Sequence, residues 1–257
     1  MGKYFSVRML EDENIQFVGK CLYIEEHKQK ILVIGDLHLG YEEVLNRGGV
    51  FISRAMFKEM IAYFERVFER VGKVNKIVLL GDVKHAFGNI MEQEWDDVLR
   101  LFDYLKKKLL ENGKIIIVKG NHDRILEPIA KLRNMVELKP YFIFHEFFFM
   151  HGDKDFFENY EKKIKYWIIG HGHPAITIRD PEGIKAEKYK CFLTGHYKKK
   201  RIIEAILVPS FFAYTEGSDP RENDLGFPWK FDFERFFVHV VGDSLDVLDF
   251  GRLGKLK

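Results

Sequence analysis

Residues Ile31–Gly40 read I-L-V-I-G-D-L-H-L-G, and this stretch decides how the rest of the chain is interpreted. Its four leading apolar residues are typical of a buried strand, which ends at Gly35. Asp36 and His38 then follow, two residues apart. Because alternate side chains of an extended segment point to the same side, this pair could face one metal ion together. The stretch therefore predicts a core strand that ends at a ligand site.

The same order of an apolar run, a glycine and polar ligand-type residues recurs four more times. The later apolar runs are Lys76–Leu80, Lys114–Lys119, Glu146–Met150 and Tyr166–Ile169, and they lead to Asp82; Asn121, His122 and Asp123; His151; and His171 and His173. Taken alone, a Gly-Asp pair is common in turns, a lone histidine is common in cores, and an Asn-His-Asp triplet can cap a helix. Chance explains five consecutive examples poorly, so we interpret them as one site.

Two amphipathic helices are predicted between the first three strands. The segments Ser53–Val71 and Glu92–Leu110 carry apolar residues at helical spacing. Ser53 is the expected N-cap of the first helix and Gly72 its expected C-cap, and a shorter helix is expected at Pro128. Short strands that alternate with helices predict a largely parallel sheet covered on both faces. In such sheets, ligands bind beyond the carboxyl ends of the strands.

The second half of the chain predicts a mostly antiparallel sheet. Two hairpins are expected, one across residues 195–200 and one across Gly242-Asp243. The aromatic-rich runs are interpreted as core strands. The remaining predicted strands of the chain are Gln16–Val18, Cys21–Ile24, Tyr141–Phe144, Lys188–Thr194, Ile202–Val208, Phe237–Val241 and Leu245–Phe250.

Length and composition predict one globular domain over residues 1–257. The chain is 46% hydrophobic and 31% charged, and it has no low-complexity segment or long linker. No apolar run approaches the roughly 18–20 residues that a membrane span needs, so no membrane partner is expected. The first ten residues lack the apolar core of a secretory signal, so we expect a cytoplasmic location. The abundance of Lys, Glu and Phe suggests a thermophilic source.

The clusters contain enough donors for two metal ions. Three carboxylate or amide oxygens and four imidazoles, with His122 left over, can surround two ions that share one carboxylate. Imidazole with carboxylate suits Mn, Fe, Zn, Co or Ni rather than Ca or Mg. The two cysteines, Cys21 and Cys191, lack the spacing of a zinc site and are interpreted as ordinary thiols. Two such ions acidify a shared water and clamp a phosphoryl oxygen, which predicts phosphoester hydrolysis.

The ordered motifs G-D-L-H, G-D-V-K-H, G-N-H-D, H-G-D and G-H-G-H resemble those of the calcineurin-like metallophosphoesterases. They run from Gly35 to His173, a little over half the chain. The chain looks closest to the prokaryotic, often archaeal, ICC-like branch, which is related to DNA-ligase-associated phosphoesterases. This resemblance implies an α/β (α+β) fold, a four-layer α-β-β-α sandwich of two mixed sheets flanked by helices.

The resemblance also implies roles at the matching positions. One ion would be held by Asp36, His38 and His173, the other by Asn121, His151 and His171, with Asp82 bridging them. A hydroxide shared by the ions would be the nucleophile, and manganese is the favoured metal. His122 would protonate the leaving oxygen, and Asp123 would orient its ring.

The chain departs from the family pattern after the bridging aspartate. Many members carry an acidic residue there, but this chain reads Asp82-Val83-Lys84-His85. Lys84 or His85 could contact a substrate phosphate, or both could be surface or supporting residues.

We favour a small phosphodiester such as a cyclic nucleotide as the substrate, because a net charge of +2 does not suit extended nucleic acid. A nuclease, a phosphoprotein phosphatase and a non-catalytic metal-binding scaffold are the alternatives. A scaffold predicts lost ligands, and this sequence has lost none. The oligomeric state is left open.

Overall fold

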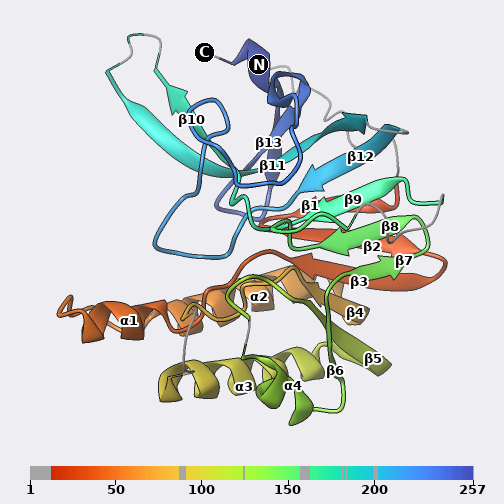
Figure 1. Cartoon of the computed structure of the whole chain (residues 1–257), viewed down its shortest axis with the longest axis vertical. Helices are drawn as coiled ribbons and strands as arrows, with labels where there is room; N and C mark the ends of the chain where they lie inside the picture. Colours follow the sequence, from red (N-terminus) through yellow and green to blue (C-terminus); the bar gives the residue numbers. More distant parts are fainter. Residues whose placement is uncertain are drawn as a thin grey trace.

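The computed structural model of the chain describes residues 13–86, 91–123, 125–156, 163–180, 182, 184–198 and 202–256. In these ranges two mixed β-sheets pack face to face, and helices cover the outer face of the first sheet (Figure 1). The predicted sandwich of two mixed sheets is confirmed. None of the helices in the same ranges has the length and apolar character needed to cross a membrane.

The first sheet has six strands that lie side by side in sequence order. They are β1 (Ile15–Val18), β2 (Cys21–Glu26), β3 (Gln29–Ile34), β4 (Val74–Leu79), β5 (Leu109–Val118) and β6 (Val136–Lys139). Strands β3 to β6 run parallel, with Ile34 beside Leu79 and Leu79 beside Ile117. The chain therefore leaves β3, β4 and β5 at the same edge of the sheet.

In the part of the chain that the structure describes, four α-helices accompany this sheet: α1 (Tyr41–Arg47), α2 (Met56–Val71), α3 (Glu92–Lys107) and α4 (Glu127–Lys131). The prediction that Ser53 caps α2 is wrong, because the helix begins at Met56. The first N–H groups, of Ala55 and Met56, instead donate to the Glu42 carboxylate at 2.9 and 3.0 Å. A carboxylate at this end satisfies free N–H groups and suits the helix dipole. The predicted C-cap, Gly72, is confirmed with a φ of 70°.

Helix α3 ends at Lys107, earlier than its apolar pattern predicts. Strand β5 begins directly afterwards, because Leu109 pairs with Val74 of β4. Strand pairing therefore overrides the helical periodicity of the last predicted turn. The short elements α1, β6 and β10 were not predicted.

The second sheet has eight strands, in the order β14-β13-β11-β12-β9-β8-β7 with β10 paired to β11. They are β7 (Phe142–Phe144), β8 (Phe147–Met150), β9 (Tyr166–Ile169), β10 (Ala175–Arg179), β11 (Ala186–Lys198), β12 (Ile202–Leu207), β13 (Phe237–Val241) and β14 (Val247–Arg252). The predicted hairpin across Gly242-Asp243 is confirmed. The pairing of β11 with β12 is also confirmed, but the predicted turn at 195–200 begins too early, because residues 195–198 continue β11 and pair with β12. Residues 199–201 lie outside the described residues. Within this mostly antiparallel sheet, β8, β9 and β12 run parallel.

Three buried apolar layers fix the two sheets in place. One lies between the helices and the first sheet, and a second lies between the two sheets. The third covers the outer face of the second sheet, where Trp167 packs with Trp229. This cover includes residues near the 3-10 helix Phe233–Arg235, and another 3-10 helix spans Leu253–Lys255. The predicted core role of the phenylalanine runs is confirmed, since Phe147–Phe149 are fully buried.

Candidate metal centre

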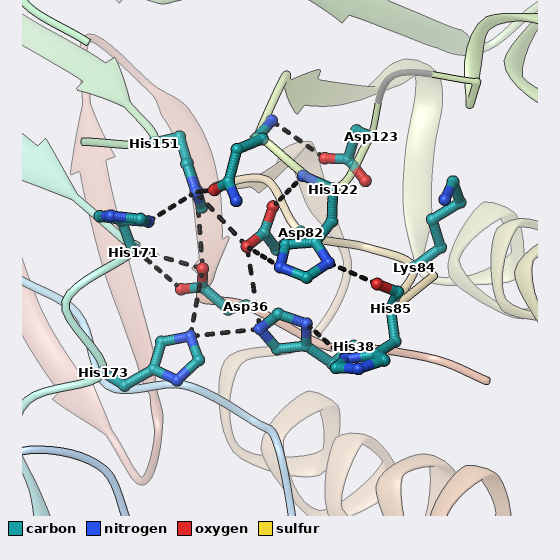
Figure 2. A network of polar contacts seen from close by, with 12 residues as sticks. Asp36, His38, Asp82, Lys84, His85, His122, Asp123, His151, His171 and His173 are labelled. Carbon is teal, nitrogen blue, oxygen red and sulfur yellow. Dashed lines mark hydrogen bonds and ion pairs between the residues drawn. The ribbon is translucent and has the colours of Figure 1, made fainter. Parts of the chain in front are cut away.

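The ends of five parallel strands, three from the first sheet and two from the second, converge on one cluster of polar side chains. The residues that follow these strands are Asp36 and His38; Asp82; Asn121, His122 and Asp123; His151; and His171 and His173. Figure 2 shows the imidazoles and carboxylates of this set facing one another across the space between the two sheets. The structure therefore brings together clusters that lie far apart in the sequence.

A first group of donors consists of Asp36, His38 and His173. The Nε2 atoms of His38 and His173 are 3.3 Å apart, and His173 Nε2 lies 3.5 Å from Asp36 Oδ1. One donor atom from each residue lies within 4.8 Å of the others. Two imidazole nitrogens and one carboxylate oxygen thus face the same point.

A second group consists of Asp82, His151 and His171. His151 Nε2 lies 3.1 Å from His171 Nδ1 and 3.5 Å from Asp82 Oδ2. The amide oxygen of Asn121 joins the group, 3.0 Å from the same His151 nitrogen. Asp82 Oδ2 is also 3.8 Å from His38 Nε2. The Asp82 carboxylate therefore lies between the two groups.

Four of these residues have backbone angles that L-amino acids rarely adopt. His38, Asp82, His171 and His173 have φ values of 49°, 46°, 61° and 41°. Each such residue costs roughly 1–3 kcal/mol, and such outliers cluster at functional sites. Gly120 permits the tight approach of Asp82, because a Cβ atom on this glycine would lie 2.2 Å from Asp82 Oδ1. The backbone is thus shaped to aim side chains into the centre.

Burial and neighbouring charges set the protonation of the centre. Burial alone would raise the pKa of Asp36, but the facing His173, His151 and His38 together hold that pKa below its usual value. Burial raises the pKa of Asp82 to about 7. Burial also lowers the pKa of His38 to about 2, so its ring is neutral. Neutral imidazole is the form that binds metal.

The His122 ring lies beside the centre, and a backbone carbonyl orients it. Its Nδ1 donates to the His85 carbonyl, and its Nε2 is 3.8 Å from Asp82 Oδ2. Asp123 is fully buried, and its carboxylate accepts from the N–H groups of Val83 and Gly120, both at 3.0 Å. These contacts make Asp123 a brace between the loops after β4 and β5. The predicted orienting role of Asp123 toward His122 stays a prediction.

Lys84 and His85, the tentative substrate contacts, are placed differently from each other. Lys84 is fully buried, its Nζ donates to the Ala86 carbonyl, and its side chain extends away from the histidines (Figure 2). His85 lies inside the cluster, with Nδ1 3.3 Å from Nδ1 of His38. Burial, assisted by His122 and Lys84, lowers the pKa of His85 to about 4. His85 therefore contacts a candidate ligand as a neutral ring.

One further strand end reaches the centre, and sequence reasoning missed it. Strand β12 runs parallel to β9, and the chain after it passes beside β3. The Phe211 N–H donates to the Asp36 carbonyl at 2.8 Å, and the Phe212 ring lies 5.0 Å from the His38 ring. This strand ends in V-P-S-F-F, which contains no ligand-type cluster. Only the parallel pairing with β9 could have revealed its position.

The donor set fits divalent transition-metal ions. Among the described residues, three groups of three side chains could each hold an ion, and the third is His38, His85 and His122. All three groups consist of imidazoles alone or with a carboxylate. Such donors favour Mn, Fe, Co, Ni or Zn, whereas Mg and Ca prefer oxygen ligands.

Comparisons with known proteins agree with this geometry. The sequence model of the calcineurin-like phosphoesterases matches residues 29–200, and that family uses a dinuclear centre of divalent metal ions. A crystal structure of the nuclease MPE from Pseudomonas putida has the same fold. Its TM-score is 0.55 and its identity 18%, over 92% of this chain and 100% of that one. No curated protein matches the sequence.

Proposed function

Because the chain belongs to the calcineurin-like phosphoesterase family, we propose that it hydrolyses a phosphodiester or a phosphomonoester with two divalent metal ions. The family supports phosphoester hydrolysis, and the donor groups support metal dependence. A small phosphodiester such as a cyclic nucleotide is the favoured substrate. The net charge of +2 supports this choice, because nucleic acid binding draws on many basic side chains.

The position of Asp82 is the observation that carries the proposal. Its Oδ2 lies 3.8 Å from His38 Nε2 and 3.5 Å from His151 Nε2, so one carboxylate reaches a donor of each group. In the proposed assignment, one ion is held by Asp36, His38 and His173, the other by Asn121, His151 and His171, and Asp82 is shared. When bound, two such ions lower the pKa of a water and neutralise charge on a phosphoryl oxygen. Manganese is the favoured metal.

His122 is the proposed proton donor to the leaving oxygen. Its Nδ1–H is held by the His85 carbonyl, so Nε2 is the nitrogen that can gain and lose a proton on the side of Asp82. Burial lowers the pKa of the His122 ring. The negative charge of a phosphate bound nearby favours the protonated ring. Binding of the substrate would therefore favour the protonated form of His122, which is the form that can act as the acid.

Metal-dependent turnover tests the proposal. The purified protein with Mn²⁺ is expected to hydrolyse bis-p-nitrophenyl phosphate, and a panel of cyclic nucleotides, DNA and a phosphopeptide then identifies the substrate class. His122→Ala should lose about 10²–10⁴-fold in kcat and keep both ions, because it removes only proton transfer. His27→Ala is the matched control, since His27 lies at the surface with its side chain 63% exposed.

Two outcomes contradict the proposal. One is the binding of two ions without hydrolysis of any phosphoester in the panel, which would favour the scaffold alternative. The other is full turnover by the metal-free protein. Preferential cleavage of DNA or of the phosphopeptide would keep the chemistry and replace the favoured substrate.

A further inference from the structure

A row of three aromatic rings leads from the metal centre to the surface. The Phe212 ring lies 5.0 Å from His38 and 4.8 Å from Tyr41, and the Tyr41 ring lies 5.3 Å from Tyr214. Phe212 is buried, Tyr41 is half-buried and Tyr214 is 42% exposed. We call these three residues the aromatic shelf. Its inner end touches a candidate ligand, and its outer end faces solvent.

The outermost ring of the shelf is fixed at its hydroxyl. The Tyr214 hydroxyl donates to Glu42 Oε1 at 2.9 Å. Glu42 is itself buried, and the same oxygen accepts from the N–H groups of Ala55 and Met56 at the start of α2. The hydroxyl hydrogen is thereby used inside the protein. What Tyr214 offers to a ligand is the face of its ring.

The main chain that carries Tyr214 is fixed as well. The Lys190 ammonium donates to the carbonyls of Phe212 and Thr215 at 2.9 and 2.7 Å, on either side of Tyr214. Lys190 is buried, so it ties this segment to strand β11 of the second sheet. A ring held at both its hydroxyl and its main chain loses little conformational freedom when a ligand binds.

We propose that the aromatic shelf stacks on the nucleobase of a nucleotide substrate and so selects nucleotide phosphodiesters over aliphatic ones. The proposal rests on the proposed function, because the phosphate must bind at the adjacent metal centre. Aromatic faces stack on any base, at about 1–3 kcal/mol per base. The Tyr214 ring is held in one orientation at the outer end of a row of rings that begins at His38. It is therefore in a position to stack on the base of a nucleotide whose phosphate lies at the metal centre.

Substitutions at Tyr214 separate the ring from its hydroxyl. Tyr214→Leu removes both, whereas Tyr214→Phe keeps the ring and loses only the hydrogen bond to Glu42. With Mn²⁺ present, Tyr214→Leu should raise KM for 2′,3′-cyclic AMP by roughly 5- to 100-fold. Tyr214→Phe should raise it much less, because this variant keeps the ring and the main-chain contacts and loses only the constraint at the hydroxyl. For glycerophosphoglycerol, an aliphatic diester that carries no base and no cationic group, both variants should match wild type in kcat/KM.

Binding of AMP measured by calorimetry gives a readout that does not need turnover. Tyr214→Leu should weaken AMP binding by the same factor, and Tyr214→Trp, which keeps a larger ring in a folded variant, should restore it. An unchanged AMP affinity and an unchanged KM in a folded Tyr214→Leu variant would overturn the shelf. A wild-type protein that cleaves neither diester but loses AMP affinity in Tyr214→Leu would instead contradict the proposed function and keep the shelf.

Discussion

The two sheets orient their candidate ligands by different means. His151, which follows β8 of the second sheet, donates its Nδ1–H to the Leu80 carbonyl at 2.7 Å. His38, which follows β3 of the first sheet, has its Nδ1 3.3 Å from the His85 ring. Both arrangements leave Nε2 directed at Asp82. A partner on the second nitrogen fixes the tautomer and the orientation of a metal-binding imidazole.

This difference predicts which substitutions can disturb the orientation of the metal-binding histidines. The Leu80 carbonyl belongs to the main chain, so no substitution at that position removes the partner of His151. The partner of His38 is a side chain, and a single substitution removes it. The Asp36 carboxylate, in contrast, connects the two sheets, because the N–H of His171 donates to both of its oxygens at 3.1 and 3.2 Å. The centre therefore lies where the two sheets meet. The orientation of His38 can be lost through a single substitution, whereas that of His151 cannot be lost by substituting Leu80.

The largest effect is expected from Asp82→Ala. This variant removes the carboxylate that lies between the Nε2 atoms of His38 and His151, and a bound metal ion contributes several kcal/mol to a transition state. Turnover should fall by at least about 10³-fold, and metal analysis should return fewer than two ions per chain. Asp96→Ala, on the exposed face of α3, is the control. Two tightly bound ions in Asp82→Ala would show that the groups are independent.

The next effect concerns Lys190 of strand β11 in the second sheet and appears in how the free energy of unfolding depends on pH. Burial, with a contribution from Lys20, lowers the pKa of Lys190 from 10.5 to about 8. Between pH 8 and 10.5 the Lys190 side chain therefore binds more protons in the unfolded chain than in the folded one, so its contribution to the free energy of unfolding rises with pH, by about 3 kcal/mol. The difference in the free energy of unfolding between wild type and Lys190→Met, measured by denaturant titration, should show this rise. Burial raises the pKa of the Cys21 and Cys191 thiols, and their opposing contribution is common to both proteins and cancels in the difference.

An exposed lysine on the same strand provides the comparison for that experiment. The curve of Lys188→Met should run parallel to that of wild type, because the Lys188 side chain is exposed. Parallel curves for wild type and Lys190→Met over this pH range would mean that Lys190 keeps its proton when buried. In that case, its hydrogen bonds to Phe212 and Thr215 outweigh the cost of burial.

The fold was predictable where the signal is local. Apolar runs and helical spacing in the first half located β3, β4, β5 and the two long helices. In each of these segments, the apolar pattern within the segment itself indicates which residues are buried. The N-cap of α2 was not predictable in this way, since Glu42 reaches Ala55 and Met56 across a turn of the chain. The parallel order of β8, β9 and β12 was also hidden, because pairing between distant strands leaves no mark on either one.

The candidate site was predictable as a set of residues but not as a geometry. Ligand-type side chains after glycines stand out in a sequence, so Asp36, Asp82 and His151 could be named. The positive φ angles of His38 and His173 could not, because non-glycine residues hold them only when the surrounding fold imposes them. The contact between His38 and His85 likewise depends on two loops meeting, and the sequence left the role of His85 open.

The smallest effect is expected from a substitution of His85, the side-chain partner of His38. His85→Phe keeps a ring against Phe212 and leaves the main-chain carbonyl that holds His122, but it removes the nitrogen that faces His38. Affinity for one of the two ions should fall by about 10- to 100-fold, as is typical when the partner of a metal-binding histidine is lost. The other ion should bind as in wild type. Calorimetric titration with Mn²⁺ resolves the two sites.

Leu80→Val is the matched variant on the other side of the centre. It alters a side chain but keeps the carbonyl that holds His151, so both ions should bind with wild-type affinity. Nitrogen-15 spectra of the His38 ring should show a mixture of tautomers in His85→Phe and a single one in Leu80→Val. Equal losses at both sites in His85→Phe would mean that the ring supports the whole cluster rather than His38. That result would contradict the inference that His38 and His151 differ in how easily a substitution disturbs their metal binding.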